Sequence, residues 1–232
     1  AFTVPPPQAV DLSPLLLTPE QLKDNKYPGH TSPSVSVPSH HPADGSVDPT
    51  AGAAYRFLPS SDAPARVFAL DCEMVLVGSS RVASLARATV VDEGGDTVLD
   101  VVVKPEGEVV DYLTRWSGIS AESYSDPESY VTFEAAMSRL RDVLKRQDVL
   151  VGHSLENDLR ALRLFHDRVV DTAVLYADAE TGKKHALKYL LKGVLDVSIQ
   201  EGKGGHDSVE DAVGALKLAL VKGKYGGGVR VR

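Results

Sequence analysis

Val67-Phe68-Ala69-Leu70-Asp71-Cys72-Glu73-Met74-Val75 runs from apolar, strand-favouring residues into two acids one residue apart. Side chains alternate faces along a strand, so Asp71 and Glu73 point to the same side of a sheet. Neighbouring carboxylates repel each other without a cation between them, and Mg²⁺ favours carboxylate and phosphate oxygens. The segment therefore predicts either a solvated strand end or two ligands of a metal site.

Composition narrows the class of protein. The chain has 232 residues, 43% hydrophobic and 25% charged, which suits one sizeable globular core. No apolar run approaches the roughly 20 residues that cross a bilayer, so we expect no membrane association. The net charge of −7 argues against a large basic surface for nucleic acid, but not against an enzyme that grips one strand end. The single cysteine, Cys72, excludes an internal disulfide, and its acidic neighbours argue against a nucleophile.

Residues 1–61 form a Pro-rich N-terminal arm that differs from the rest of the chain. Thr18 as N-cap and Pro19 as first residue predict one short helix in the arm. Residues 30–49 are typical of a flexible linker. The composition is compatible with an arm that packs on the domain, covers its cleft or extends into solvent. Pro-rich segments dock on aromatic grooves, so the arm is also a candidate site for a protein partner.

Residues 62–225 predict one α/β domain, followed by a flexible tail at 226–232. Strands come first, with Glu93-Gly94-Gly95 as a hairpin signal between the second and third. Strands and helices then alternate, which predicts a mixed sheet, three antiparallel strands followed by parallel ones, flanked by helices. The expected strands are 67–75, 84–92, 96–104, 149–152 and 169–172, and the expected helices are 133–146, 186–191 and the segment from 208 to about 222.

Two more acids and a histidine lie at the starts of predicted helices. Asp158 follows the strand 149–152, and Asp211 lies early in the last helix, just after His206. Asp211 also fits a capping box with Ser208, so a structural role competes with metal binding. Four carboxylates and one histidine suit two-metal phosphoryl transfer, in which paired cations clamp the scissile phosphate and a histidine accepts a proton from water.

Other polar and aromatic residues are candidates for holding a nucleic acid. Arg115 and Trp116 fit a phosphate and a base, since aromatic stacking holds single strands without regard to sequence; the alternative is a tryptophan that anchors a loop to the core. Lys183, Lys184 and Lys188 either line the same path or form a solvated surface. We expect His153 to be structural, because one base suffices for the reaction and His206 follows flexible glycines. We expect Asp171 to cap an element or support a ligand.

Three segments resemble the exonuclease motifs of the DEDDh superfamily, and most of all its eukaryotic Rex-type RNA exonuclease branch. They are Leu70–Val75, Gly152–Leu159 and His206–Ala212. Weaker likenesses to the same branch are Trp116–Ile119, Val170–Thr172, and Leu17–Leu22 with Tyr27-Pro28, although that branch usually has Leu where Gly29 stands. The likeness covers Val67 to about Val221. The three motifs together, in this order, are far more specific than any one alone.

The resemblance implies an RNase H-like fold and 3′→5′ hydrolysis of single-stranded RNA ends to nucleoside 5′-monophosphates with two Mg²⁺ or Mn²⁺ ions. It implies that Asp71, Glu73, Asp158 and Asp211 are the metal ligands, with Asp71 bridging, and that His206 is the base. It places Met74 at the terminal nucleotide, where a core methionine is the alternative. We add Asn157, within the second motif, to the substrate-binding set with Arg115 and Trp116.

The resemblance also implies a role in RNA processing and a nuclear location, with the nucleolus included. We expect a monomer. Two alternatives share these residues: an exonuclease directed at DNA, and a non-hydrolytic RNA-binding adaptor that recruits partners through its arm. The intact acid set speaks against the adaptor, and RNA can be told from DNA only by contacts with the 2′-hydroxyl.

Overall fold

The computed structural model describes residues 3–6, 10–30, 55–200, 205–226 and 229. Its strands are β1 (Arg56–Phe57), β2 (Val67–Val77), β3 (Val82–Asp92), β4 (Thr97–Val102), β5 (Val109–Asp111), β6 (Val149–Gly152), β7 (Leu164–Phe165) and β8 (Val169–Asp171). Six of them form the central sheet, in the order β4-β3-β2-β6-β8 with β5 paired to β2. β2, β3 and β4 are antiparallel neighbours, whereas β6 and β8 run parallel to β2. The predicted mixed sheet is confirmed.

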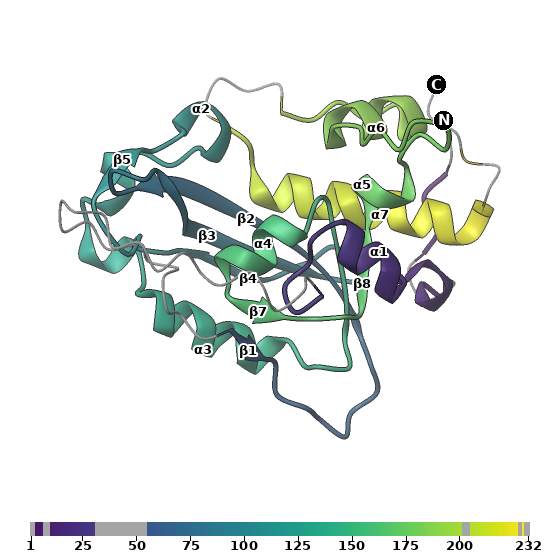
Figure 1. The fold of residues 1–232 in the computed structure, drawn as a ribbon, viewed down its shortest axis with the longest axis horizontal. Coiled ribbons are helices and arrows are strands. Elements are labelled where there is room, and N and C mark those ends of the chain that lie inside the picture. The colour runs from purple at the N-terminus through teal and green to yellow at the C-terminus, as the bar shows by residue number, and fades with distance from the viewer. Residues whose placement is uncertain (1–2, 7–9, 31–54, 201–204, 227–228, 230–232) are drawn as a thin grey trace.

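Helices cover both faces of this sheet. They are α1 (Pro19–Asp24), α2 (Thr114–Ser117), α3 (Phe133–Val143), α4 (Glu156–Ala161), α5 (Thr172–Leu175), α6 (Leu187–Leu195) and α7 (Ser208–Tyr225), with 3-10 turns at Ser13–Leu15, Ala121–Tyr124 and Pro127–Ser129. In Figure 1, α6 and α7 lie on one side of the sheet and α3 lies on the other. None of the described helices combines the length and apolar content that a membrane-spanning segment requires.

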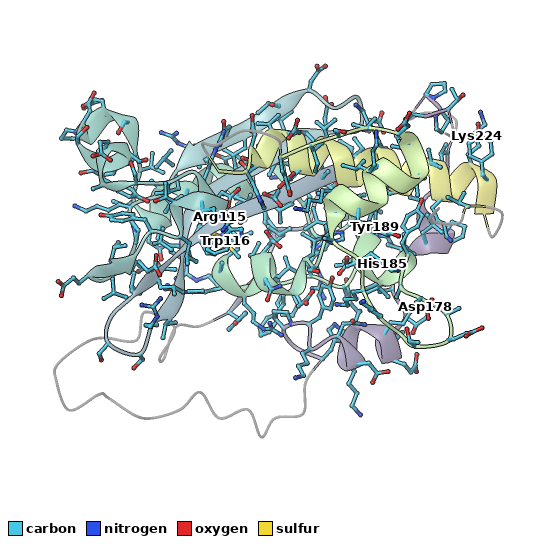
Figure 2. The ribbon with its side chains drawn as sticks, turned by 90° about the horizontal axis from the view of Figure 1, so that it is seen from above. Arg115, Trp116, Asp178, His185, Tyr189 and Lys224 are labelled. Atoms are coloured by element: carbon cyan, nitrogen blue, oxygen red, sulfur yellow. The ribbon has the colours of Figure 1, made fainter. Side chains whose placement is uncertain are left out.

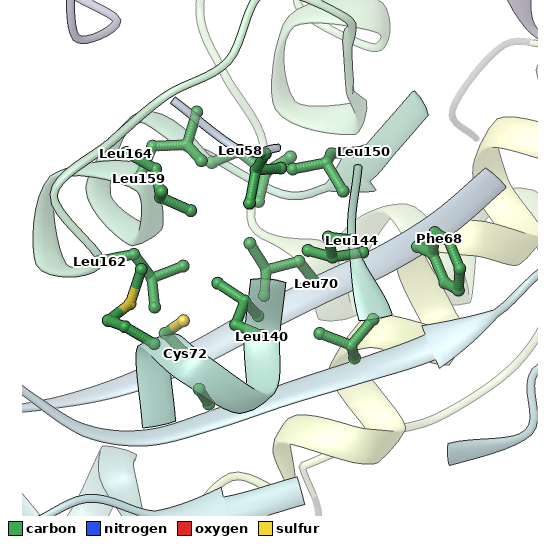
Figure 3. Packing of buried hydrophobic residues seen from close by; sticks show 14 of the residues in the cluster. Leu58, Phe68, Leu70, Cys72, Leu140, Leu144, Leu150, Leu159, Leu162 and Leu164 are labelled. Atoms are coloured by element: carbon green, nitrogen blue, oxygen red, sulfur yellow. The ribbon is translucent and has the colours of Figure 1, made fainter. Parts of the chain in front are cut away.

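Alternation along β2 divides the core into two apolar layers. Phe68, Leu70 and Cys72 pack in the layer that also contains residues of α3 and α4 (Figure 3), whereas Ala69 packs with residues of α6 and α7. Cys72 is therefore buried away from the acids on either side of it, as the strand period predicts. A bulge between Glu73 and Met74, in the middle of β2, shifts the pairing with β3 directly after the second acid.

The described part of the arm packs on the domain. Thr18 caps α1 as predicted: its hydroxyl accepts from Gln21 N at 3.2 Å, while the Gln21 side chain accepts from Thr18 N at 2.9 Å. Leu22 and Tyr27 are buried in the same layer as Leu70. The linker prediction falls almost entirely outside the described residues, and the division of the chain at residues 61 and 62 stays a prediction. Of the predicted tail, Gly226 and Val229 are described; Gly226 is exposed and Val229 is buried.

Candidate active site

Four acids from three elements converge at the middle of β2, just beyond the point where its pairing with β6 ends at Ala69. Asp71 and Glu73 come from β2 itself, Asp158 from the first turn of α4 and Asp211 from the first turn of α7. The charges of Glu73, Asp158 and Asp211 all act on the carboxyl of Asp71. We call these four side chains the carboxylate cluster.

Burial and mutual repulsion shift the protonation of the carboxylate cluster. Burial, followed by the charges of the other three acids, raises the pKa of Asp71 well above its usual range. Burial also raises the pKa of Glu73 and of Asp158 to about 8 each, and that of Asp211 to about 6. The site therefore favours protons or cations over bare negative charge.

The backbone of β2 fixes Asp158. Cys72 N donates to Asp158 Oδ1 at 2.8 Å, which brings α4 against the strand between the two β2 acids. The turn before α4 is tight, because Ser154 lies in the left-handed region at φ 60°. At Gly152 an added Cβ would lie 2.5 Å from the Leu155 side chain, so this junction requires a glycine.

His206 lies beside Asp211, with Nδ1 3.6 Å from Asp211 Oδ2. His206 N donates to Trp116 O at 2.7 Å, which joins the histidine loop to α2. Gly205 makes this approach possible, because at φ +93° an added Cβ would lie 2.3 Å from Gly118 N. Burial, and then the charge of Lys188, lower the pKa of His206, so the imidazole is neutral near pH 7 and able to accept a proton.

The predicted capping box at α7 is wrong. The N-cap is Asp207, whose carboxylate accepts from Val209 N at 3.0 Å. Ser208 instead lies 2.7 Å, hydroxyl to hydroxyl, from Thr89 in β3. Asp211 is thus one position too late to act at N3, and its carboxylate takes no part in capping α7.

These acids, on these elements, match a known family. Residues 68–219 match the family model RNase_T: Exonuclease. The chain belongs to the RNase T exonuclease family. It is 43% identical to "RNA exonuclease 5" of Bos taurus over 161 residues, 69% of this chain and 20% of that protein. It is 42% identical to "RNA exonuclease 1" of Saccharomyces cerevisiae over 157 residues, 67% of this chain and 28% of that one.

Solved exonuclease structures share its fold. The Neurospora crassa Pan2 catalytic unit gives a TM-score of 0.64 at 28% identity over 73% of this chain and 28% of that one. The Saccharomyces cerevisiae Pan2 exonuclease module in complex with A7 RNA gives 0.61 at 29% identity over 69% and 29%. The fold is therefore RNase H-like, and the DEDDh, Rex-type resemblance is confirmed. The chain spans less than a third of the length of these relatives.

One contact within this candidate site was not predicted from the sequence. The Gln200 side-chain amide donates to both oxygens of Asp211, at 3.0 and 2.9 Å, and Gln200 N donates to Glu210 Oε2 at 3.0 Å. Gln200 is thus the residue that orients the Asp211 carboxylate. A lone glutamine outside any motif carried no signal in the sequence.

The carboxylate cluster suits hard cations. Its donors are carboxylate oxygens, which Mg²⁺ and Mn²⁺ prefer, and burial together with the neighbouring carboxylates raises the pKa of Asp71 and Glu73, so the site favours added positive charge. Within the described residues, no three His, Cys, Asp or Glu side chains stand close enough to enclose an ion in their present positions. Repulsion between the carboxylates keeps them apart when no cation is bound, and the hydrogen bonds from Gln200 hold Asp211 in its present position.

Trp116 and Arg115 border the site on exposed α2. The indole is 54% exposed, so it is not a core anchor, and the Arg115 guanidinium lies 5.7 Å from its ring centroid. Beside them, a hollow of about 460 Å³ is lined by Gly118, Gly205 and His206, among others.

The remaining predicted residues are placed differently. Met74 is half-buried against the layer of Leu70, compatible with both of its predicted roles. Asn157 is exposed, but its side chain makes local bonds, to Ser154 O at 3.2 Å and from Arg160 at 3.4 Å. His153 Nδ1 lies 2.9 Å from the Thr172 hydroxyl, and Asp171 caps α5, both as structural roles require.

A stacked aromatic pair lies at the start of α6. His185 and Tyr189 stack with ring centroids 5.3 Å apart, and Tyr189 is half exposed. Figure 2 shows this pair and the Arg115–Trp116 pair in one view, well separated from each other. Lys188 lies between His185 and Tyr189 in the sequence. Its charge lowers the pKa of His206, so the start of α6 faces the site.

Proposed function

We propose that this chain is a metal-dependent 3′→5′ exoribonuclease that trims single-stranded RNA ends to nucleoside 5′-monophosphates. The observation that supports it most is the convergence of four acids on a histidine 3.6 Å from the last of them. Relatives named RNA exonuclease, and a Pan2 exonuclease module solved with RNA, support RNA as the polymer.

Asp71, Glu73, Asp158 and Asp211 would hold two Mg²⁺ or Mn²⁺ ions, with Asp71 reached by the charges of the other three. The chemistry such ions supply is charge stabilisation on the scissile phosphate and activation of a water molecule. Gln200 keeps Asp211 in one orientation.

His206 accepts the proton of the attacking water. The new bond joins the water oxygen to phosphorus, and the bond to the 3′-oxygen of the preceding nucleotide breaks. That oxygen takes up a proton as the shortened RNA leaves with a free 3′-hydroxyl, and the last nucleotide leaves as a 5′-monophosphate. The lowered pKa of His206 suits this role near neutral pH.

Trp116 and Arg115 would hold the terminal nucleotides by stacking and by charge, with Met74 lining the pocket and Asn157 at its edge. Stacking is supported by the exposed indole one residue from Arg115. Trp116→Ala should raise KM by about tenfold with little change in kcat, since one base–aromatic stack contributes about 1–3 kcal/mol.

A paired-substrate digestion tests the proposal. RNA and DNA of one sequence, each 5′-labelled, are incubated with Mn²⁺, Mg²⁺ or EDTA. We expect a ladder of single-nucleotide steps and free 5′-monophosphates from RNA, lost in EDTA. Preference for the DNA strand would support a DNA exonuclease, and tight RNA binding without mononucleotides would support an adaptor.

The wider setting is proposed from the resemblance alone: RNA processing, in the nucleus or nucleolus, by a monomer that can recruit a partner through its Pro-rich arm. Size-exclusion chromatography coupled to light scattering tests the oligomeric state. Fluorescence of the full-length protein fused to a reporter tests the location.

A further inference from the structure

Tyr27 makes a buried contact far along the chain from its own segment. Its hydroxyl donates to Asp171 Oδ2 at 2.6 Å, and both residues are fully buried. The arm reaches this point because Leu17 N donates to Val169 O, at 2.9 Å, alongside β8. After the end of α1, Tyr27 N donates back to Leu22 O at 2.9 Å.

Asp171 passes this contact on to the turn before α4. Its other oxygen, Oδ1, accepts from Ser154 N at 2.9 Å and from Ala173 N at 2.8 Å. Ser154 is the left-handed residue of that turn, and such a conformation persists only where its surroundings hold it. Asp158 follows within one helical turn.

The arm also holds the far side of α4. Arg160, two residues after Asp158, donates from its guanidinium to Lys26 O. Two neighbouring arm residues therefore contact the segment that bears Asp158, Lys26 directly and Tyr27 through Asp171. Neither contact belongs to the carboxylate cluster itself.

We propose that Tyr27 is a positioning residue: through Asp171 it fixes the turn that sets Asp158, so residues 10–30 are part of the catalytic unit. This inference rests on the proposed exonuclease function. Without the Tyr27 hydroxyl, one oxygen of the buried Asp171 carboxylate has no donor, and the side chain can rotate away from Ser154 N to find one. Displacement of a reacting group by about an ångström can cost about 10²-fold in rate, so a looser turn lowers kcat.

Tyr27→Phe removes only the hydroxyl. We expect kcat to fall by about three- to tenfold at saturating Mn²⁺, less than is usual for residues that hydrogen-bond a metal ligand directly, with KM within twofold. We also expect faster amide hydrogen exchange in the peptide covering residues 153–158, because Ser154 N loses a firmly held acceptor.

Tyr176→Phe is the matched control. Its hydroxyl donates to Leu218 O at 2.9 Å in the other apolar layer, and it is likewise buried. Both variants should lower the melting temperature, but only Tyr27→Phe should change kcat and exchange at 153–158. Equal behaviour of the two variants in kcat and exchange would overturn the inference and leave a purely structural role.

The double variant Tyr27→Phe/Asp171→Asn tests the route. If Tyr27 acts through Asp171, the double variant has the kcat of Asp171→Asn alone; effects that multiply would overturn this route. A wild-type protein without metal-dependent nuclease activity refutes the proposed function instead. The exchange measurement would then still decide whether Tyr27 holds the turn.

Discussion

Two groups of buried acids lie in this fold, and they differ in what surrounds them. Asp148, before β6, accepts from Arg66 N at 2.9 Å and Lys145 N at 2.8 Å, with the Arg66 guanidinium at 3.5 Å. Asp171 likewise has three donors. Each of these carboxylates is matched by donors, as buried charge in a structural role requires.

Asp71 and Glu73, two members of the carboxylate cluster, have the opposite surroundings, whereas Asp158 accepts from Cys72 N and Asp211 from the Gln200 amide. Within the described residues, the side-chain carboxylates of Asp71 and Glu73 accept no hydrogen bond, and the charges that act on them are mostly other carboxylates. Arg87 is the cation that acts on both, but it is paired with Asp100 by two bonds of 2.7 Å. Burial alone therefore does not mark a functional acid; an excess of buried carboxylates over donors does.

The largest expected effect is that of Asp71→Asn. If Asp71 is a metal ligand, as proposed, its loss removes several kcal/mol of transition-state stabilisation, so kcat should fall by about 10³-fold or more. The same change should raise the melting temperature in EDTA at pH 8, because it removes one repelling charge. Nuclease assays and thermal unfolding measure the two effects, and a destabilised variant would place Asp71 with the matched acids.

His206→Ala should slow hydrolysis by about 10²–10⁴-fold, since it removes the proposed proton acceptor and leaves the proposed metal ligands in place. The Mn²⁺ concentration for half-maximal activity should stay within twofold of wild type. A large rise in that concentration would show instead that His206 supports the metal site.

Asp148→Asn should have the opposite effects to Asp71→Asn: it should lower stability and leave turnover nearly unchanged. The amide replaces one acceptor oxygen by a donor facing Lys145 N or Arg66, so the free energy of unfolding should fall by about 1–3 kcal/mol. Turnover by the folded enzyme should stay within twofold of wild type. Denaturant unfolding and kcat at 20 °C below the variant's melting temperature decide between the outcomes.

The last prediction concerns the pH dependence of stability. The pKa of Glu73 rises from 4.5, and that of Asp158 from 3.8, to about 8 each on folding, so the folded state binds more protons than the unfolded state between about pH 4 and pH 8. The free energy of unfolding in EDTA should therefore fall as pH rises through this window. Saturating Mn²⁺ should flatten the decline, and Asp71→Asn should make it shallower. A stability that rises with pH in EDTA would contradict the raised pKa values.

Local patterns predicted much of this fold. The apolar run into Asp71, the glycine turn before Asp96 and the Thr18 cap each act within a few residues, so sequence spacing determines them. The convergence of the acids came from motif likeness, because spacing along the chain says nothing about approach in space.

Contacts between distant segments escaped the sequence. Neither the Tyr27–Asp171 bond nor the Gln200–Asp211 bond has a periodic signal, since each joins one polar group to another across the fold. The spacing of Ser208 and Asp211 favours a capping box at α7, but Asp207 is an equally good N-cap, and Ser208 pairs with Thr89 instead.

The contact of Gly205 with Gly118 constrains how this protein can change over generations. Because a Cβ at residue 205 would lie 2.3 Å from Gly118 N, the backbone just before His206 touches the backbone at the end of α2. Any larger residue there would separate the two at once, although its side chain takes no part in hydrolysis. In a library randomised at position 205 and selected for nuclease activity, glycine should be the residue recovered, as strictly as aspartate at 71.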